Sequence, residues 1–175
     1  MKSIKSKVVL CIIVASLVAL AVPVMAGKNG PAGKSNTGHL YLYEKDPSTW
    51  EIVDGGAWGK MKYNLSGPEF DFNFNGHGLE AGEEYLLIYY PDPWPGNNLI
   101  CLGEGIANKG GNVHIKKSVN TGDLPAEDDA NVNEGAKIWL VLSDDVDCDE
   151  QKMIGWDPTE YLFEYDLITF DDTDE

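Results

Sequence analysis

The sequence predicts an all-β protein, a single antiparallel β-sandwich of about eight short strands with an immunoglobulin-like arrangement. Apolar and polar residues alternate over short runs, and no window keeps the 3.6-residue apolar spacing of an amphipathic helix. Clusters of Gly, Pro, Asn and Asp separate these runs, as turns between strands require. The chain has 175 residues, and the 149 that follow a removable N-terminal segment of 26 are enough for one domain.

The N-terminal segment has the order of a secretory signal peptide. Residues 1–7 carry three lysines and no acid, residues 8–22 are apolar, and Ala26 is a small residue suited to cleavage. We therefore expect a signal peptide over 1–26 and a secreted or extracellular protein, with attachment to the cell surface as one variant. Residues 27–38 are predicted to be a flexible leader, 39–170 the β-sandwich domain and 171–175 an acidic tail.

The strand predictions follow from the residue pattern. Phenylalanines at 70, 72 and 74 alternate with acids and amides over 69–75, which predicts one buried face, and 58–65 alternates in the same way. Residues 85–90 and 137–142 are apolar at nearly every position, which predicts central strands with either both faces covered or one face partly aromatic and exposed. The other expected strands are 39–45, 50–53, 98–107 and 113–119. Turns rich in Gly and Asn, such as 75–78 and 108–112, join them.

The charge excludes some partners. The chain has 13 lysines, no arginine and 29 acids, a net charge of -16; without the three lysines of the signal it becomes 10 - 29 = -19. Nucleic acid is excluded as a partner because phosphate binding needs a basic face. An integral membrane protein is not expected, because no second apolar run approaches the roughly 20 residues that span a bilayer. The absence of arginine also weakens the case for anionic ligands.

Two cysteines remain once Cys11 is removed with the signal. Cys101 and Cys148 are predicted to form a disulfide, since an even number of cysteines in a secreted chain is typically paired; two free thiols are the alternative. In the chain-entropy description, this bond contributes on the order of 4 kcal/mol.

The most distinctive segment is 89–96, where three prolines within five residues stiffen a loop beside aromatic side chains. We predict that Tyr89, Tyr90 and Trp94 form an aromatic platform that binds a glycan or a protein. The alternative is that Trp94 folds back and closes one end of the sandwich.

An acidic cluster spans 144–150. Asp145, Asp147 and Asp149 have the spacing of the first three ligands of a calcium loop. Glu150 and Trp156 stand where an EF-hand needs Gly and Glu, so an EF-hand is excluded. An irregular Ca²⁺ site is one interpretation, and a solvated acidic loop is the other. No other cofactor is expected.

Asn64-Leu65-Ser66 is the only N-glycosylation sequon in the chain, so Asn64 is a glycosylation candidate.

Two resemblances add to these predictions. The Leu79, Gly82 and Tyr85 spacing resembles a passage of fibronectin-like and immunoglobulin-like domains. The segments 89–96, 135–141 and 161–164 resemble a group of small secreted β proteins found mainly in methanogenic archaea. This resemblance implies an extracellular or cell-surface setting and brings neither an activity nor catalytic residues.

No catalytic motif stands out, since no serine lies in a G-x-S-x-G elbow and the many acids make no single pair informative. The sequence therefore favours a non-catalytic secreted or cell-surface domain that binds glycan or protein. The alternatives are a small secreted hydrolase or cation-dependent enzyme using the 144–150 cluster, and a self-associating fibre or sheath subunit that assembles through strand edges.

Overall fold

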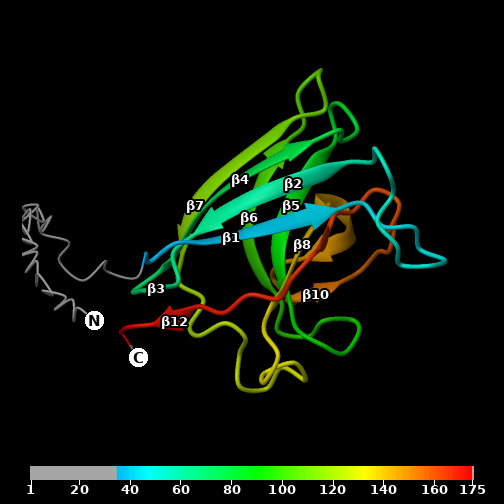
Figure 1. Cartoon of the computed structure of the whole chain (residues 1–175). Coiled ribbons are helices and arrows are strands. Elements are labelled where there is room, and N and C mark those ends of the chain that lie inside the picture. Colours follow the sequence, from blue (N-terminus) through cyan, green and yellow to red (C-terminus); the bar gives the residue numbers. More distant parts are fainter. Residues whose placement is uncertain (1–34, 175) are drawn as a thin grey trace, which may run out of the picture. The chain divides into compact units, whose positions relative to one another are not determined.

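The computed structural model describes residues 35–174, which form a β-sandwich with no α-helix in that range (Figure 1). The predicted all-β sandwich is confirmed. The strands are β1 Gly38–Tyr43, β2 Trp58–Tyr63, β3 Ser66–Gly67, β4 Phe70–His77, β5 Glu84–Tyr90, β6 Ile100–Ile106, β7 Val113–Val119, β8 Lys137–Leu142, β9 Val146–Asp147, β10 Lys152–Met153, β11 Phe163–Glu164 and β12 Asp171–Asp172. A short 3-10 helix, Ser143–Asp145, follows β8.

Two antiparallel sheets carry the fold. One has five strands in the order β11-β1-β2-β4-β7, and the other has three in the order β6-β5-β8. The alternating pattern of β4 places Phe70, Phe72 and Phe74 on the buried face, as the sequence predicts. They pack between the sheets against Tyr85 and Leu87 of β5, in the main hydrophobic core.

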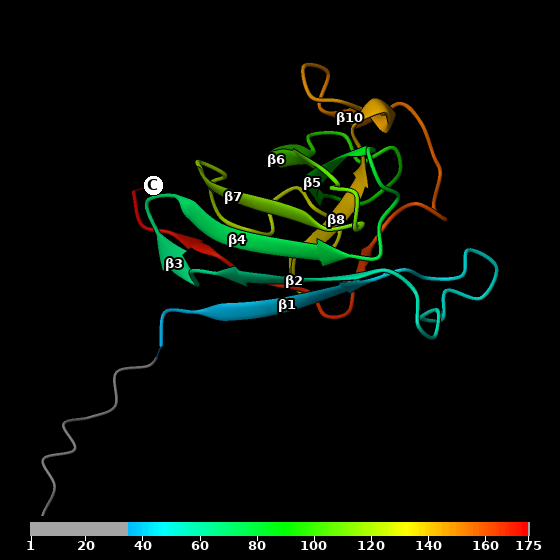
Figure 2. The ribbon, with the colours of Figure 1, turned by 90° about the horizontal axis from the view of Figure 1, so that it is seen from above.

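A second core lies on the outer face of the three-stranded sheet. Leu86 and Ile88 of β5 and Trp139 of β8 pack there against Tyr161 and Phe163. Figure 2 shows the segment with β10 on the side of this sheet away from β1 and β2. This cover explains why β5 and β8 are apolar at almost every position, and it confirms that both of their faces are buried. β5 is the middle strand of its sheet, as predicted, whereas the prediction of a central strand over 137–142 is wrong, because β8 lies at the edge in the order β6-β5-β8.

The C-terminal segment joins the two sheets along one side. Leu162 pairs with Leu140 of β8, and the next residue, Phe163, pairs with Tyr43 of β1. Residues near 161–168 therefore bond to both sheets and close that side of the sandwich.

Some predicted boundaries need correction. The expected strand 50–53 is reduced to one bridge, between Lys45 and Ile52, because these residues belong to a loop between β1 and β2. The order of the strands also does not support an immunoglobulin-like arrangement. In that fold the first two strands share a sheet with the fourth and fifth, whereas β1 and β2 here continue directly into β4, and β5 and β6 lie in the other sheet.

The two ends of the domain are more ordered than expected. Asn36, within the predicted leader, accepts hydrogen bonds from the backbone N–H groups of Leu65 and Ser66 at 3.2 and 3.0 Å. In the predicted tail, β12 pairs with β3, and the N–H of Asp172 donates to Asp123 Oδ1 at 2.7 Å. The predicted signal peptide, and the leader before residue 35, lie outside the described residues.

Within residues 35–174, no helix is long and apolar enough to span a lipid bilayer.

Candidate functional site: a tryptophan-lined groove

Four of the five tryptophans meet at one groove on the outer side of the three-stranded sheet, although they are far apart in the sequence. We call this site the tryptophan groove. Its volume of 370 Å³ is within the range of small-ligand sites. Its lining residues are Lys45, Trp50, Tyr90, Asp92, Trp94, Lys137, Trp139, Trp156, Phe163 and Glu164.

The indole rings form one contiguous aromatic surface. Trp156 is central, with ring centroids 5.3 Å from Trp94, 6.4 Å from Trp50 and 6.1 Å from Trp139. Trp139 is 8% exposed and lies at the base, whereas Trp50, Trp94 and Trp156 are 51, 53 and 43% exposed. Three large apolar rings are therefore held open to solvent in one place, which is unusual unless they bind something.

The loop between β5 and β6 carries Trp94. It is fixed by backbone hydrogen bonds from Gly96 to Pro93 O at 2.9 Å and from Met153 to Pro95 O at 3.0 Å. Gly96 has φ of +71°, and a Cβ atom there would lie 2.4 Å from the Tyr90 ring. Only glycine fits this close approach, which seats the loop directly on the aromatic base of the groove.

Trp50 enters from the loop between β1 and β2. Its N–H donates to Asp46 O at 2.7 Å, and the carboxylate of Asp46 accepts from the N–H and hydroxyl of Ser48. Trp50 has φ of +61°, a left-handed conformation that costs a residue with a Cβ about 1 kcal/mol or more. Its ring then lies edge-on to Phe163 at 5.2 Å. The strained backbone at Trp50 therefore accompanies the placement of its ring over the groove.

Trp156 is positioned by the residues on either side of it. The N–H groups of Ile154 and Gly155 donate to Asp145 O at 2.8 and 3.1 Å, and the N–H of Asp157 donates to the Tyr161 hydroxyl at 3.0 Å. The Tyr161 hydroxyl in turn donates to the Asp145 carboxylate. Burial is the main cause that raises the pKa of Tyr161, so this hydroxyl keeps its proton.

Charged groups at the base of the groove are paired. Lys137 forms an ion pair with Asp92, and Trp139 Nε1 donates to the Glu164 carboxylate. Burial opposes the ionised form of Asp92, yet hydrogen bonds from Lys137 and Asn131 outweigh it and hold the pKa of Asp92 below its usual range.

Burial dominates for Glu164 and raises its pKa, despite the opposing hydrogen bond from Trp139 and the nearby charge of Lys45. With Lys45, Lys137, Asp92 and Glu164, the groove holds two groups of each sign, so it suits a ligand without net charge.

Two of the predicted platform residues do not belong to the exposed surface. Tyr89 is fully buried, and its hydroxyl donates to Asp129 Oδ2 at 2.6 Å and accepts from the Ala126 N–H at 3.1 Å. Tyr90 is 2% exposed and stacks on Trp139 with ring centroids 3.9 Å apart. Both are strand residues of β5, so only Trp94 of the three is free to contact a ligand through an exposed face.

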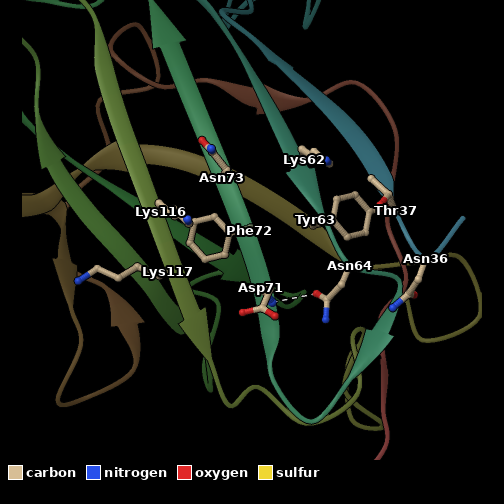
Figure 3. Close-up of a pocket in the computed structure, with 10 residues that line it drawn as sticks. All are labelled: Asn36, Thr37, Lys62, Tyr63, Asn64, Asp71, Phe72, Asn73, Lys116 and Lys117. Atoms are coloured by element: carbon tan, nitrogen blue, oxygen red, sulfur yellow. Dashed lines mark hydrogen bonds between the residues drawn. The ribbon is translucent and has the colours of Figure 1, made fainter.

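The glycosylation candidate Asn64 is held in the turn after β2. Its Nδ2 donates to Ser66 O and Glu69 O at 3.2 and 2.9 Å, and its Oδ1 accepts from the Asp71 N–H at 2.8 Å, the bond dashed in Figure 3. A glycan on Nδ2 replaces one of its two hydrogens and would therefore remove one of these two donated bonds in the folded domain.

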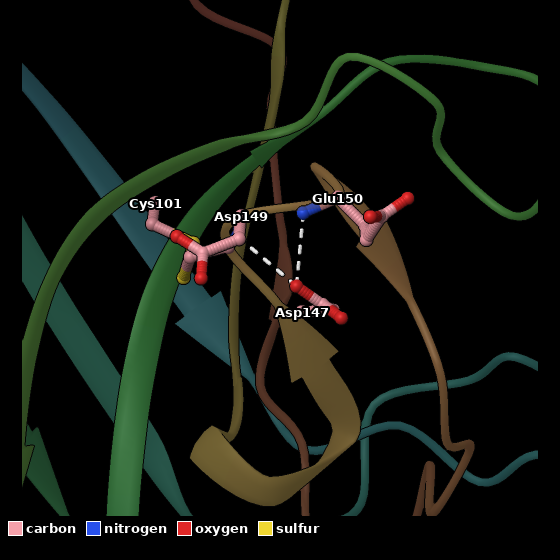
Figure 4. The surroundings of a disulfide bond; sticks show 5 residues. Cys101, Asp147, Asp149 and Glu150 are labelled. Carbon is pink, nitrogen blue, oxygen red and sulfur yellow. Dashed lines mark hydrogen bonds between the residues drawn. A yellow bond between two sulfur atoms is a disulfide. The ribbon is translucent and has the colours of Figure 1, made fainter.

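The disulfide between Cys101 and Cys148 is confirmed and joins β6 to the acidic loop (Figure 4). The structure does not bring the three predicted calcium ligands together. Asp145 faces Tyr161, whereas Asp147 Oδ1 accepts from the N–H groups of Asp149 and Glu150 at 3.0 and 2.9 Å. No group of three His, Cys, Asp or Glu side chains within residues 35–174 is arranged to hold a metal ion. Asp145 instead organises the loop that carries Trp156.

Comparison of the chain with protein-family models, with curated proteins and with solved structures finds no match. The groove must therefore be interpreted from its own geometry. Sequence reasoning found Trp94 but missed Trp50, Trp139 and Trp156. The one signal in the sequence is that Trp50 and Trp156 each stand close to an Asp-Pro pair, 46–47 and 157–158, which is typical of a loop.

Proposed function

We propose that the protein is a non-catalytic binding domain whose tryptophan groove holds a neutral glycan. The observation that supports this most directly is the convergence of three solvent-exposed indoles beside two lysines and two acids, whose charges sum to zero. Apolar C–H faces of a sugar ring stack on indole, while its hydroxyl groups hydrogen-bond to carboxylate and ammonium groups. Asp92, Lys137 and Glu164 supply such groups beside the rings.

The ring spacing favours a platform over a cage for a cationic ligand. An aromatic cage needs several ring faces around an empty centre, each within about 6 Å of the cation. Here Trp94 and Trp156 meet edge-to-face with centroids 5.3 Å apart, so these rings contact each other directly. A flat ligand lying across the exposed faces suits this arrangement better than a compact ammonium group between them.

We further propose that the domain works outside the cytoplasm. The signal-like residues 1–26 support export, and the bond between Cys101 and Cys148 supports an oxidising compartment, where disulfides persist. The N-terminal sequence of protein recovered from the medium or envelope of expressing cells tests this proposal. A mature N-terminus at Gly27 is expected, and recovery only of uncleaved cytoplasmic protein would contradict it.

The binding proposal is tested by retention of the protein on neutral cell-envelope polysaccharides and by titration of tryptophan fluorescence. We expect the exposed variants Trp94→Ala and Trp156→Ala to lower affinity at least about fivefold each, since loss of one stacking partner removes about 1–3 kcal/mol in stacks of nucleic-acid bases on aromatic side chains. Because four of five tryptophans line the groove, ligand binding should also change the wild-type fluorescence strongly.

Trp58→Ala is the matched control. Trp58 is 40% exposed, similar to Trp156, but it lies on β2 against His77 and outside the groove. This variant should bind like wild type. Equal retention of all three variants and the wild type would rule out the groove as the binding site.

A further inference from the structure

The outer face of the five-stranded sheet differs in charge from the rest of the domain. Outward-facing positions of β1, β2, β4 and β7 include Lys60, Lys62 and Lys116, and also His39, His77 and His114. Residues 35–174 contain 28 acids, the 29 of the chain less Glu175, but only Asp71 occupies one of these outward positions. We call this surface the lysine face.

The lysines of this face are close together and have no carboxylate partner. The strand register aligns Lys62 with Asn73, and Asn73 with Lys116, so the two lysines lie two strands apart, at about 10 Å. The two ion pairs of residues 35–174 are Lys137–Asp92 and Lys152–Glu150, and neither uses this face. Clustered like charges destabilise a sheet unless something neutralises them, even though acids are abundant elsewhere in the chain.

A shallow depression lies among these lysines. Figure 3 shows Lys62, Asn73 and Lys116 on neighbouring strands, with Asn36 and Asn64 at one end. Its volume is 470 Å³, and three amides and three ammonium groups outnumber the single carboxylate, that of Asp71, in its lining. Such a depression suits the insertion of carboxylate side chains, which accept hydrogen bonds from both kinds of group.

The same chain carries a complementary surface. Residues 143–150, which we call the acidic roof, hold Asp144, Asp149 and Glu150 exposed to solvent. The disulfide at Cys148 and the turn closed by Asp147 fix this segment in place, so little conformational entropy is lost when it docks. The roof lies on the outer side of the three-stranded sheet, opposite the five-stranded sheet that bears the lysine face (Figure 2).

We infer that the lysine face binds the acidic roof of a second copy of this chain. Each copy then presents one surface to each of two neighbours, a head-to-tail contact that forms open chains of molecules unless the rotation closes a ring. Local charge complementarity acts within the screening distance of about 8 Å at physiological ionic strength, whereas the net repulsion between copies is largely screened. The contact uses residues other than those that line the tryptophan groove.

Sedimentation of the purified protein over a range of concentrations tests this inference. The wild type should form larger species at physiological ionic strength, where the net repulsion is screened, and return to monomers as salt is raised toward about 1 M, where the screening distance falls to about 3 Å. Lys62→Glu should weaken association at least about tenfold, because it places a like charge against the roof. Lys109→Glu makes the same charge change in the turn after β6, away from the face, and should associate like the wild type.

A charge-swap pair separates a direct contact from a general charge effect. One variant carries Glu at 60, 62 and 116, and the other carries Lys at 144, 149 and 150. Each should stay monomeric alone, and an equal mixture of the two should assemble, because the intact roof of the first meets the intact lysine face of the second. A monomeric wild type at high concentration and physiological ionic strength would overturn the inference. So would equal loss of association in Lys62→Glu and Lys109→Glu, or a monomer whose lysine face instead retains an anionic polysaccharide.

Discussion

The hydroxyl of Tyr161 donates a hydrogen bond to the carboxylate of Asp145 and thereby fixes the loop that presents Trp156 to the groove. The same hydroxyl accepts the N–H of Asp157, so one buried phenol organises both sides of Trp156. A residue expected to bind calcium thus acts through a tyrosine to position an indole.

Removing this hydroxyl should loosen the loop. Tyr161→Phe leaves the Asp145 carboxylate and the Asp157 N–H without their partner, which we expect to lower the free energy of unfolding by about 1–3 kcal/mol. Groove binding should weaken as well, because Trp156 loses its fixed position. Urea unfolding and ligand titration measure the two effects. Tyr165→Phe, at a ring that is 63% exposed, should change neither, and equal stability of the two variants would contradict the assigned role.

The disulfide should contribute strongly to stability. Cys101 and Cys148 are 47 residues apart, and replacing both by serine should cost about 4 kcal/mol of unfolding free energy in the chain-entropy description. The acidic roof would also lose its attachment to β6. Thermal unfolding of the oxidised wild type and the double variant compares them, with near-ultraviolet circular dichroism reporting on the tryptophans. Superimposable melting curves would show that the bond does not constrain the domain.

Gly96 should be intolerant of any side chain. Gly96→Ala places a Cβ 2.4 Å from the Tyr90 ring, whereas Gly82→Ala, also at positive φ, meets nothing within 4 Å. Both variants are destabilised because alanine disfavours the left-handed backbone conformation. Only Gly96→Ala also creates a steric overlap, which costs about 1–3 kcal/mol. We expect Gly96→Ala to be the less stable by that difference in urea unfolding. Equal midpoints would mean that the loop moves away freely.

The free energy of unfolding should depend on pH through the ionisation of Glu164. Burial raises the folded-state pKa of Glu164 above the ordinary 4.5, so this group favours the fold below about pH 4.5 and loses that contribution as the pH rises through the raised value. Glu164→Gln keeps an oxygen acceptor for Trp139 but cannot ionise. The variant should therefore match the wild type near pH 4 and become relatively more stable toward pH 7. A stability difference that is the same at both pH values would contradict this cause.

The sequence predicted the strands better than the site because strands depend on local periodicity. Phe70, Phe72 and Phe74 show their buried face by alternation alone, and the unbroken apolar run of β5 indicates two covered faces. The short pairs β9–β10 and β3–β12 have two residues per strand, too few to show any period. They form because longer neighbours bring them together.

The groove depends on contacts between distant segments, which residue patterns do not encode. Tyr89 and Tyr90 were assigned to the platform because they precede Trp94 in the sequence, but the strand that contains them turns both rings into packed surroundings. Trp50 and Trp156 join Trp94 only through the sheet pairing that brings β1 and β11 together. The acids 145–149 suggested a cation, whereas neighbouring tyrosine and backbone groups account for the roles of Asp145 and Asp147.

The closing segment near 161–168 also determines when the protein can finish folding. Lys45 Nζ donates to Glu164 O across 119 residues, and β1 pairs with β11 over a similar distance along the chain. Such non-local pairings make folding slow, because a large loop must close before its contacts form. The ring of Trp50, in an early loop, contacts two aromatic rings of the C-terminal part, Trp156 and Phe163, and neither is available until that part has been synthesised. The tryptophan groove can therefore form only after nearly the whole chain has been synthesised. A chain truncated before residue 161 would lack the groove entirely.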